Sequence, residues 1–390
     1  MTSRGIVTRV LGLLATGAVL AAAGGAATAQ PKEYRIGAIM ELSGPFSQWG
    51  APMRDAIQLA IDNINAGGGI KGVPVRLVIY DGRSRGTEAA LLAKRLVEQD
   101  KVVAIIGPGT SPTTMPVIPY VEQVGVPTLS MGSSDRIIEP PVERRWMFRA
   151  PYGSRHNVEK LVEHFKAKGI KKIGFMSVNN AYGDTGREEF AKAAGPAGIE
   201  VVAWEKFGGT DTDMKPQLTK LRGLAPQAIV VWSIPPAASI VQRNRAELAM
   251  DTIAFYHDNG ASLTPQFIDL AGGAAEGAFG VVIKIDVADE LPASDPQRPL
   301  LLKFREQFES RFGMQVGGLY AEAYDCVLLI AKGLETAGAD REKLRDAIEQ
   351  TKNLVGVAAI YNLSPTNHAG VSARDLVIGQ VKNGKWTIVK

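Results

Sequence analysis

Residues 102–135 read VVAIIGPGTSPTTMPVIPYVEQVGVPTLSMGSSD, and this stretch decides the fold class. It contains two short apolar runs, at residues 102–106 and 126–130, and each run leads into a loop rich in glycine, serine and threonine. Short apolar runs that are bounded by Gly or Pro are typical of buried parallel strands. The segment between them has the length of a helix. The pattern therefore predicts a strand-helix-strand unit whose loops open at the carboxyl edge of one sheet, where open α/β folds bind their ligands.

The two loops, residues 107–114 and 131–135, carry neutral hydroxyl groups. Hydroxyls donate hydrogen bonds to carboxylate and carbonyl oxygens, and the unpaired N–H groups of a helix that begins near Thr114 would do the same. The pattern predicts a binding wall and not a catalytic centre. The residues that supply the hydroxyls are Ser111, Thr113, Thr114, Ser133 and Ser134.

The first 29 residues have the pattern of a secretory signal peptide. Arg4 and Arg9 precede an apolar stretch at residues 10–23, and Ala27-Thr28-Ala29 supplies a cleavage site. The apolar stretch is short for a membrane span. No cysteine lies directly after the cleavage site, so we expect a free protein in the periplasm without a lipid anchor. The only cysteine is Cys326, which excludes an internal disulfide.

The charge balance gives no reason to expect nucleic acid as a partner. The whole chain carries a formal net charge of +4. Removal of Arg4 and Arg9 with the leader lowers this to about +2, which is too even for an electrostatic footprint on a polyanion.

The order of apolar runs and helical periodicities predicts an α/β fold with two doubly wound parallel-sheet lobes joined by a three-segment hinge. The strand-helix alternation runs to about residue 150 and then restarts. We expect the N-terminal lobe at residues 30–150 plus 282–360 and the C-terminal lobe at residues 151–281 plus 361–390. The expected strands are residues 34–42, 73–80, 102–106, 126–130, 172–178, 200–207, 228–234 and 252–257, followed by a hairpin of residues 376–381 and 385–389 around Asn383-Gly384. The expected crossings between lobes are near residues 148–153, 276–284 and 355–365.

The motifs of catalysis and of cofactor binding are missing. The chain has no G-x-S-x-G elbow and no S-x-x-K pair, and residues 379–386 miss the phosphate-loop pattern because Trp386 stands where a hydroxyl is required. The four histidines lack the spacing of metal ligands. We therefore expect no enzyme activity, no cofactor and no metal, although an exported enzyme with an unrecognised active site remains an alternative.

Several loose motifs occur together in one order. They are Leu42-Ser43-Gly44-Pro45 followed by Trp49, Asp62-Asn63-Ile64-Asn65, Ile106-Gly107 leading to Ser111, and Asn180-Ala181-Tyr182-Gly183. With them, residues 31–390 resemble the substrate-binding proteins of branched-chain amino acid ABC transporters, which have the type I periplasmic-binding protein fold. The resemblance implies a protein that captures a small solute between two lobes and delivers it to permease subunits in the inner membrane. A monomer is expected, and a sensor that signals to a regulator is the alternative.

The resemblance also implies roles for single residues. Ser111 and the residues around Ser133 and Ser134 would hold the carboxylate or ammonium of the ligand, Trp49 would pack on its side chain, and Tyr182 would close over it. Each has a purely structural alternative: a core position for Trp49, a helix cap for Ser111, a backbone hydrogen bond for Tyr182, and a turn for the two serines.

At one position this sequence differs from the pattern of the amino acid binders that it resembles, and the difference affects which ligand is expected. Where such amino acid binders commonly present a carboxylate, this chain places Asn259, and an amide does not neutralise an ammonium as a carboxylate does. An inward-facing Asp258 would keep an amino acid open. Trp232 is expected to add an aromatic wall. The candidates are an aliphatic amino acid or another small molecule with a carboxylate or amide, such as an aromatic acid.

Overall fold

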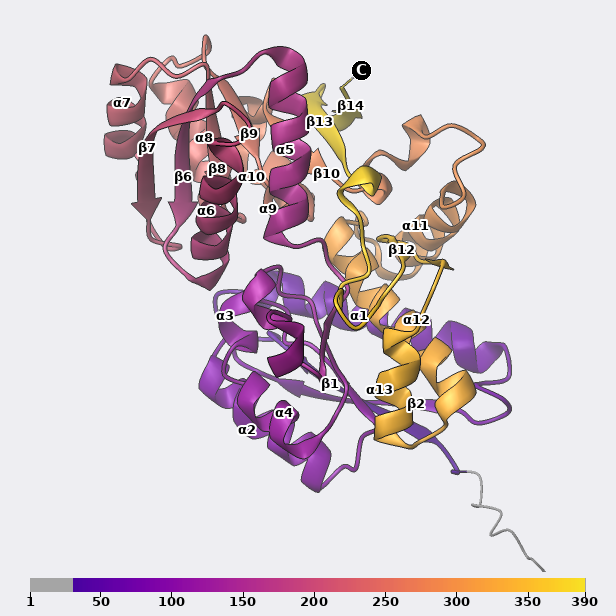
Figure 1. Cartoon of the computed structure of the whole chain (residues 1–390). Coiled ribbons are helices and arrows are strands. Elements are labelled where there is room, and N and C mark those ends of the chain that lie inside the picture. Colours follow the sequence, from indigo (N-terminus) through magenta and orange to yellow (C-terminus); the bar gives the residue numbers. More distant parts are fainter. Residues whose placement is uncertain (1–30, 390) are drawn as a thin grey trace, which may run out of the picture. The chain divides into compact units, whose positions relative to one another are not determined.

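The computed structural model describes residues 31–389, and its first sheet has five parallel strands (Figure 1). In order across the sheet these are β2 (Val75–Asp81), β1 (Tyr34–Met40), β3 (Ala104–Ile106), β4 (Thr128–Ser130) and β5 (Met147–Arg149). Every residue of β3 and β4 is buried, because helices cover both faces of a parallel sheet. The proposed signal peptide, residues 1–29, lies outside the described residues.

The helices of this first lobe pack their apolar faces against the sheet and against one another. In Figure 1, α2 and α4 lie on one side of the sheet, and α12 and α13 lie on the other. Helix α1 buries Met53, Ile57 and Ala60, which share one helical face. The helices are α1 (Ser47–Ala66), α2 (Gly86–Glu98), α3 (Ser111–Thr114), α4 (Ile118–Val124), α11 (Arg298–Phe312), α12 (Gly318–Ala337) and α13 (Arg341–Glu349), with the 3-10 turns η1 (Asp135–Ile137) and η2 (Pro141–Glu143).

The second lobe is built on a sheet of seven strands. Across the sheet they are β14 (Lys385–Ile388), β13 (Val377–Lys382), β10 (Phe279–Val282), β9 (Ala254–His257), β8 (Ala228–Trp232), β6 (Lys172–Val178) and β7 (Glu200–Phe207). The strands from β10 to β7 are parallel, whereas β13 and β14 form an antiparallel hairpin at one edge. Asn383 and Gly384, the turn residues of that hairpin, both have positive φ, as a two-residue hairpin turn requires.

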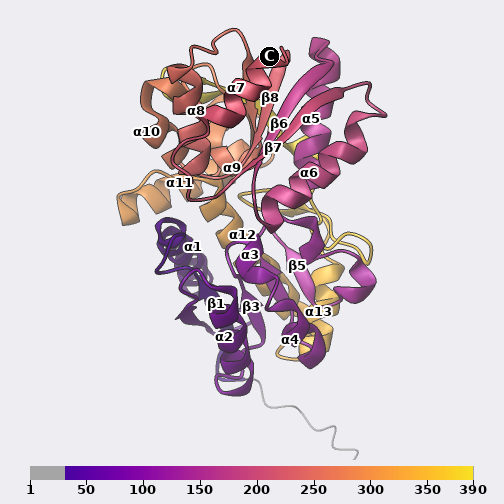
Figure 2. The same ribbon diagram turned by 90° about the vertical axis from the view of Figure 1, so that its left-hand side faces the viewer.

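Helices also cover both faces of the second sheet. Figure 2 shows α5 and α6 on one side of it and α7, α8 and α10 on the other. They are α5 (Ser154–Lys168), α6 (Ala181–Ala194), α7 (Lys215–Gly223), α8 (Ala237–Glu247), α9 (Asn259–Ser262) and α10 (Gln266–Ala271), with the 3-10 turns η3 (Gly272–Ala275), η4 (Lys284–Glu290) and η5 (Ala373–Asp375). The predicted fold class of two α/β lobes is confirmed. Among the described residues, no helix has both the length and the apolar character that a membrane crossing requires.

The chain passes between the two sheets three times. It passes from β5 to α5, then from β10 through η4 to the helices α11 and α12, and finally from a small antiparallel pair, β11 (Leu354–Val355) and β12 (Ile360–Tyr361), back to β13. The described residues from Lys32 onward form one compact unit. Three neighbouring connections restrict the two lobes to hinge motion and prevent independent tumbling.

Candidate functional site

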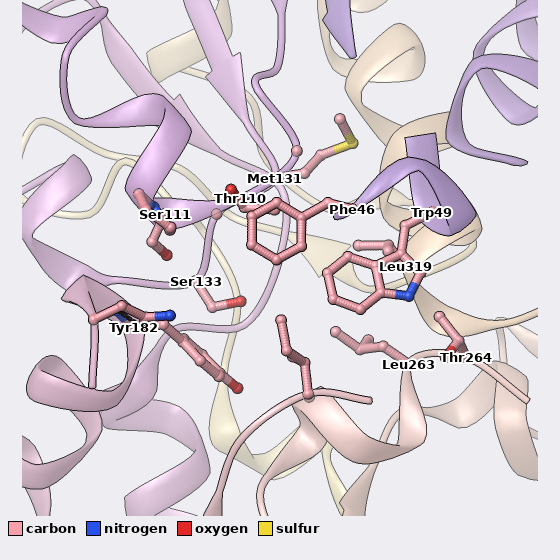
Figure 3. A pocket seen from close by; sticks show the side chains of 16 residues that line it. Phe46, Trp49, Thr110, Ser111, Met131, Ser133, Tyr182, Leu263, Thr264 and Leu319 are labelled. Carbon is pink, nitrogen blue, oxygen red and sulfur yellow. Dashed lines mark hydrogen bonds between the residues drawn. The ribbon is translucent and has the colours of Figure 1, made fainter. Parts of the chain in front are cut away.

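The candidate site is a cavity lined by residues of both lobes (Figure 3). It contains about 560 Å³ of space that protein atoms do not fill, the part open to solvent included. The lining residues are Phe46, Trp49, Gly109, Thr110, Ser111, Pro112, Met131, Gly132, Ser133, Asn180, Tyr182, Ile234, Gly260, Leu263, Thr264 and Leu319.

The first-lobe wall comes from three loops at the carboxyl ends of neighbouring strands. The loop after β3 supplies residues 109–112, the loop after β4 supplies residues 131–133, and Phe46 and Trp49 follow β1. The sequence prediction of two hydroxyl-bearing loops at one sheet edge is thus realised in the geometry. Strands β1, β3 and β4 are adjacent in the sheet, so their loops meet at that edge.

The polar groups of this wall are hydrogen-bond donors. The Ser111 hydroxyl accepts a bond from the Ser134 amide at 3.0 Å, so its own proton is free to be donated. Within residues 31–389, the backbone amides of Ser111 and Ser133 donate to no acceptor. These groups can bind the oxygen atoms of a carboxylate or carbonyl.

Phe46 and Trp49 form an aromatic part of the wall. Their ring centroids are 5.4 Å apart and their planes differ by 13°. The Trp49 indole N–H donates to Oε1 of Gln266 at 3.0 Å, a contact that reaches from α1 of the first lobe to α10 of the second. This bond satisfies the polar edge of the ring and fixes its orientation, so that Trp49 presents apolar surface to the cavity.

Tyr182 and Gly260 lie next to each other in the second-lobe wall of the cavity. Tyr182 lies in the first turn of α6, where Asn180 caps the helix by accepting bonds from the amides of Tyr182 and Gly183. The Tyr182 hydroxyl has no hydrogen-bond partner among the described residues. A Cβ atom on Gly260 would lie 2.7 Å from that hydroxyl, so only glycine leaves room for it.

The cavity wall is uncharged. None of its lining residues is Asp, Glu, Lys, Arg or His. Leu263 and Leu319 add apolar surface beside the aromatic pair (Figure 3). Such a wall cannot pair an ammonium group directly, and leaving that group buried and unpaired is costly.

Two buried carboxyl groups lie behind the wall. Glu41 accepts hydrogen bonds from the Gly109 amide and the Thr113 hydroxyl, and burial raises its pKa to about 6. Asp258 caps α9 and accepts bonds from the amides of Ser233 and Gly260, and burial raises its pKa well above the ordinary value. Neither carboxyl lines the cavity.

Four of the seven residues proposed from the sequence line the cavity, and three do not. Trp49, Ser111, Ser133 and Tyr182 surround it. Ser134 follows Ser133 but points elsewhere: its hydroxyl is 2.6 Å from that of Thr185 on α6. Trp232 and Asn259 are both fully buried.

The expected aromatic wall at Trp232 is not what the structure shows. The ring stacks on Phe175 at 6.0 Å and packs against Tyr182, in the core of the second lobe. A Cβ on Gly186 would lie 2.3 Å from the ring, which shows how closely α6 covers it. Trp232 is the last residue of β8, all of whose residues are buried, and its side chain lies in the core of the lobe. Ile234, two residues further on, lines the cavity instead.

Asn259 also lies outside the cavity lining. Its backbone amide donates to Asn157 Oδ1 at 2.9 Å, while its side-chain nitrogen and oxygen have no partner among the described residues. The expectation that either Asn259 or Asp258 faces the ligand is therefore not met by this geometry, in which Asp258 turns back to cap α9.

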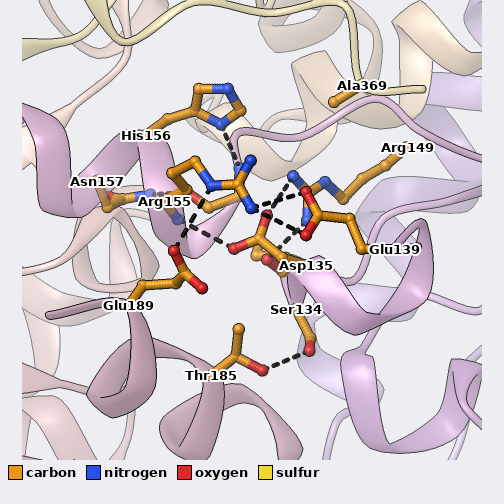
Figure 4. A network of polar contacts seen from close by, with 12 residues as sticks. Ser134, Asp135, Glu139, Arg149, Arg155, His156, Asn157, Thr185, Glu189 and Ala369 are labelled. Atoms are coloured by element: carbon orange, nitrogen blue, oxygen red, sulfur yellow. Dashed lines mark hydrogen bonds and ion pairs between the residues drawn. The ribbon is translucent and has the colours of Figure 1, made fainter. Parts of the chain in front are cut away.

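Contacts outside the cavity also join the lobes (Figure 4). The segment 134–139 of the first lobe meets α5 and α6 of the second through Ser134 with Thr185, Arg136 with Glu188, and Glu139 with Arg155 at 2.8 Å. We term these three contacts the side latch. Because Ser133 lines the cavity and Ser134 begins the latch, one loop touches both.

A buried ion pair holds this loop at the hinge. Arg149 binds Asp135 at 2.8 Å and also donates to the Ser133 carbonyl at 3.0 Å. Burial alone would raise the pKa of Asp135, but the Arg149 guanidinium and the bonds to it hold that pKa below the ordinary value. The Asp135 carboxylate also accepts from the Arg155 amide, the second residue of α5, so the pair spans the first crossing.

Comparison with known proteins places the chain among binding proteins. A family model described as "Periplasmic binding protein" matches residues 33–385. A "Leucine-, isoleucine-, valine-, threonine-, and alanine-binding protein" of Pseudomonas aeruginosa is 26% identical over 353 residues, which cover 89% of this chain and 87% of that protein. Both findings extend over nearly the whole described part of the chain.

Solved structures agree in fold. An extracellular ligand-binding receptor from Rhodopseudomonas palustris HaA2 superposes with a TM-score of 0.84 at 26% identity, covering 92% of this chain and 100% of the other. A leucine binding protein from Thermotoga maritima gives a TM-score of 0.79 at 26% identity, with 92% and 98% covered. These relatives are described as binding proteins or receptors and not as enzymes.

Proposed function

Since the chain belongs to the periplasmic binding protein family, whose model matches residues 33–385, we propose that it captures a small carboxylate-bearing solute between its lobes and delivers it to an ABC importer. The solute would carry a flat or apolar body and no ammonium group. An aromatic acid is the class that fits these requirements. The protein itself performs no reaction on it.

The uncharged cavity wall is the main reason for proposing a solute without an ammonium group. An amino acid would bring an ammonium group to a wall without a single acidic side chain. Burial of that unpaired charge costs several kcal/mol. A carboxylic acid of the same skeleton avoids this cost.

The carboxylate has a binding surface on the first lobe. The Ser111 and Ser133 side chains and their unpaired amides would donate to its oxygens. Hydrogen bonds to a charged group contribute about 1.5 to 3 kcal/mol each, so three or four of them, less the cost of closure, are enough for micromolar binding.

The apolar body would lie against Phe46, Trp49, Leu263 and Leu319, with Tyr182 closing over it from the second lobe. Burial of a side chain of this size contributes about 1.5 to 3 kcal/mol. The stacked rings of Phe46 and Trp49 favour a flat solute.

A branched-chain amino acid is the second candidate, and the described relatives from Pseudomonas aeruginosa and Thermotoga maritima favour it. In that case a buried carboxyl such as Asp258 or Glu41 would have to turn toward the cavity. The two candidates differ by one ammonium group, and this difference makes them separable in a binding measurement.

The proposal extends to location and partners. Residues 1–29 would direct export and be removed, which would leave a protein free in the periplasm. It would act as a monomer and dock on permease subunits of the inner membrane. A sensor that passes the ligand signal to a regulator is the alternative, and a gene neighbourhood without permease and ATPase subunits would favour it.

A thermal-shift screen of small carboxylic acids, their amides and amino acids tests the proposal. A solute present at about 100 times its dissociation constant adds about 2.7 kcal/mol of stability. We expect aromatic acids to raise the melting temperature most. Ser111→Ala should reduce this shift, whereas Ser310→Ala, at an exposed serine of α11, should leave it unchanged. Stabilisation by amino acids alone would contradict the proposal.

A further inference from the structure

Glu41 lies directly behind the loop that forms the polar wall. It follows β1 and is 1% exposed. Its Oε2 accepts a bond from the Gly109 amide at 3.1 Å, and its Oε1 accepts one from the Thr113 hydroxyl at 2.6 Å. Residues 109–112 of that loop line the cavity. A Cβ on Gly109 would lie 2.5 Å from Oε2, so the backbone of the loop is held against the carboxyl group.

No cation balances the Glu41 carboxyl group. On the neighbouring strand β2, Arg76 pairs with Glu33, Tyr80 donates to Asp100, and Asp81 accepts bonds from Ser43. On α1, Arg54 pairs with Asp55, and Asp62 pairs with Arg311. Within the described part of the chain, none of them forms an ion pair or hydrogen bond with Glu41. Burial raises the pKa of Glu41 to about 6, and no charged neighbour contributes to this shift.

The loop of residues 109–113 therefore lies between the Glu41 carboxyl group and the cavity. The Gly109 amide and the Thr113 hydroxyl face Glu41, whereas the Ser111 and Ser133 groups face the cavity. An anionic solute would add a second negative charge on the other side of the same loop. In a buried, weakly polarisable environment, two such charges repel strongly. Protonation of one carboxyl group removes the repulsion.

We propose that Glu41 makes the cavity sensitive to the charge of its solute, because an anionic carboxylate binds together with a proton that Glu41 takes up from solvent. This inference rests on the proposed function. Below about pH 6, Glu41 already carries the proton before binding, so the affinity is highest and constant there. Above that pH the proton must be taken up on binding, and the affinity falls by up to about tenfold per pH unit. An uncharged carbonyl solute lacks this dependence.

Benzoate and benzamide provide a matched pair of probes, because they differ in charge and share one skeleton. We expect calorimetric titrations between about pH 5.5 and pH 8, where benzoate stays ionised, to show benzoate binding weaken as the pH rises. At about pH 7.5, repetition in two buffers of different ionisation enthalpy should show proton uptake with benzoate and none with benzamide. In Glu41→Gln, benzoate should bind at about pH 8 as tightly as it binds the native protein below pH 6.

A second buried acid serves as the control. Asp325 accepts bonds from the Val357 and Ala358 amides, and burial raises its pKa to about 7, but its hydrogen-bond partners do not line the cavity. Asp325→Asn should keep the native pH profile of benzoate binding. A native profile that is flat, or a profile that Glu41→Gln leaves unchanged, would overturn the inference and leave the proposed function intact.

The ligand-free protein gives an independent check on the same residue. Glu41→Gln should raise the melting temperature at about pH 8 and leave it unchanged at about pH 4.5, where both forms are uncharged. Equal effects at the two pH values would overturn the inference whatever the solute is. If neither probe binds while leucine does, the proposed solute class and the coupled proton uptake are both contradicted, and this check still decides whether burial raises the pKa of Glu41.

Discussion

Gly260 has no side chain, and the Tyr182 hydroxyl fills the space where one would lie. The pair shows how a single backbone position shapes the cavity. The hydroxyl is left without a protein partner, so it is available to a bound solute. Its position depends on a residue of another segment, which follows β9, while Tyr182 follows β6.

Gly260→Ala tests this dependence. The added methyl group would displace the Tyr182 ring toward the cavity, and overpacking of this kind costs about 1 to 3 kcal/mol. We expect solute affinity to fall about tenfold or more in calorimetric titrations. Gly223→Ala is the matched control, because it ends α7 and a Cβ there meets no atom within 4 Å. Unchanged affinity in Gly260→Ala would contradict this description of the wall.

Some properties of single residues could be predicted from the sequence, and others could not. The hydroxyl loops after β3 and β4 were predictable because their strands are short and apolar. Which of two adjacent serines faces the cavity was not, since Ser133 lines it and Ser134 binds Thr185. Glu41 was missed: a lone acid at the end of an apolar strand gives no sign of the loop that contacts it.

At the scale of elements, the side latch joins segment 134–139 to α5 and α6 without touching the cavity. Ser134 and Thr185 are both buried, and Thr185 also donates to the Ala181 carbonyl. Removal of the Thr185 hydroxyl leaves that of Ser134 without a partner among the described residues, at a cost of about 1 to 3 kcal/mol. Hinge opening of the lobes would break these contacts, so loss of the latch should lower the fraction of binding-competent protein.

Thr185→Val should therefore weaken the binding of every solute by the same factor, about tenfold. Calorimetric titration of benzoate and benzamide measures the factor for each. Thr219→Val, at an exposed threonine of α7, is the control and should leave both affinities unchanged. A loss of affinity confined to one solute would show that Thr185 acts on the solute directly and not through closure.

The elements differ in how well the sequence predicts them. The strands predicted at residues 172–178 and 200–207 coincide with β6 and β7, because each is an uninterrupted run between clear turn signals. Strands β5 and β10 were missed. Each is short and lies beside an expected crossing, and pairing with neighbours in the sheet defines it more than its own pattern does. Leu319, at the start of α12, reaches the cavity only through the three-dimensional fold.

At the scale of the whole molecule, buried carboxyl groups determine how stability depends on pH. Burial raises the pKa of Asp286 to about 8 and that of Asp325 to about 7. Both values lie above those of the unfolded chain, so the folded state holds these protons more tightly and stability falls as the pH rises toward the folded values. Buried His257, with its pKa lowered to about 3, acts in the opposite direction, but only below its unfolded value of about 6.5.

From about pH 6.5 to pH 8 the carboxyl groups with raised pKa values lose their protons more readily in the unfolded chain, and the free energy of unfolding should drop by at least about 2 kcal/mol. Urea unfolding of the ligand-free protein at the two pH values measures this change. Asp286→Asn should reduce this drop, because it removes a carboxyl group whose pKa burial raises to about 8. Greater stability at pH 8 than at pH 6.5 would contradict the assignment of buried, protonated carboxyl groups.

The central claim is that the cavity binds a carboxylate whose body carries no ammonium group. Leucine and 4-methylpentanoate share one skeleton and differ only in that group, so their dissociation constants, measured by calorimetry on the same preparation, test the claim most directly. We expect 4-methylpentanoate to bind at least about tenfold more tightly, because an unpaired buried ammonium costs more than about 1.4 kcal/mol. Tighter binding of leucine would contradict the claim and assign the site to an amino acid.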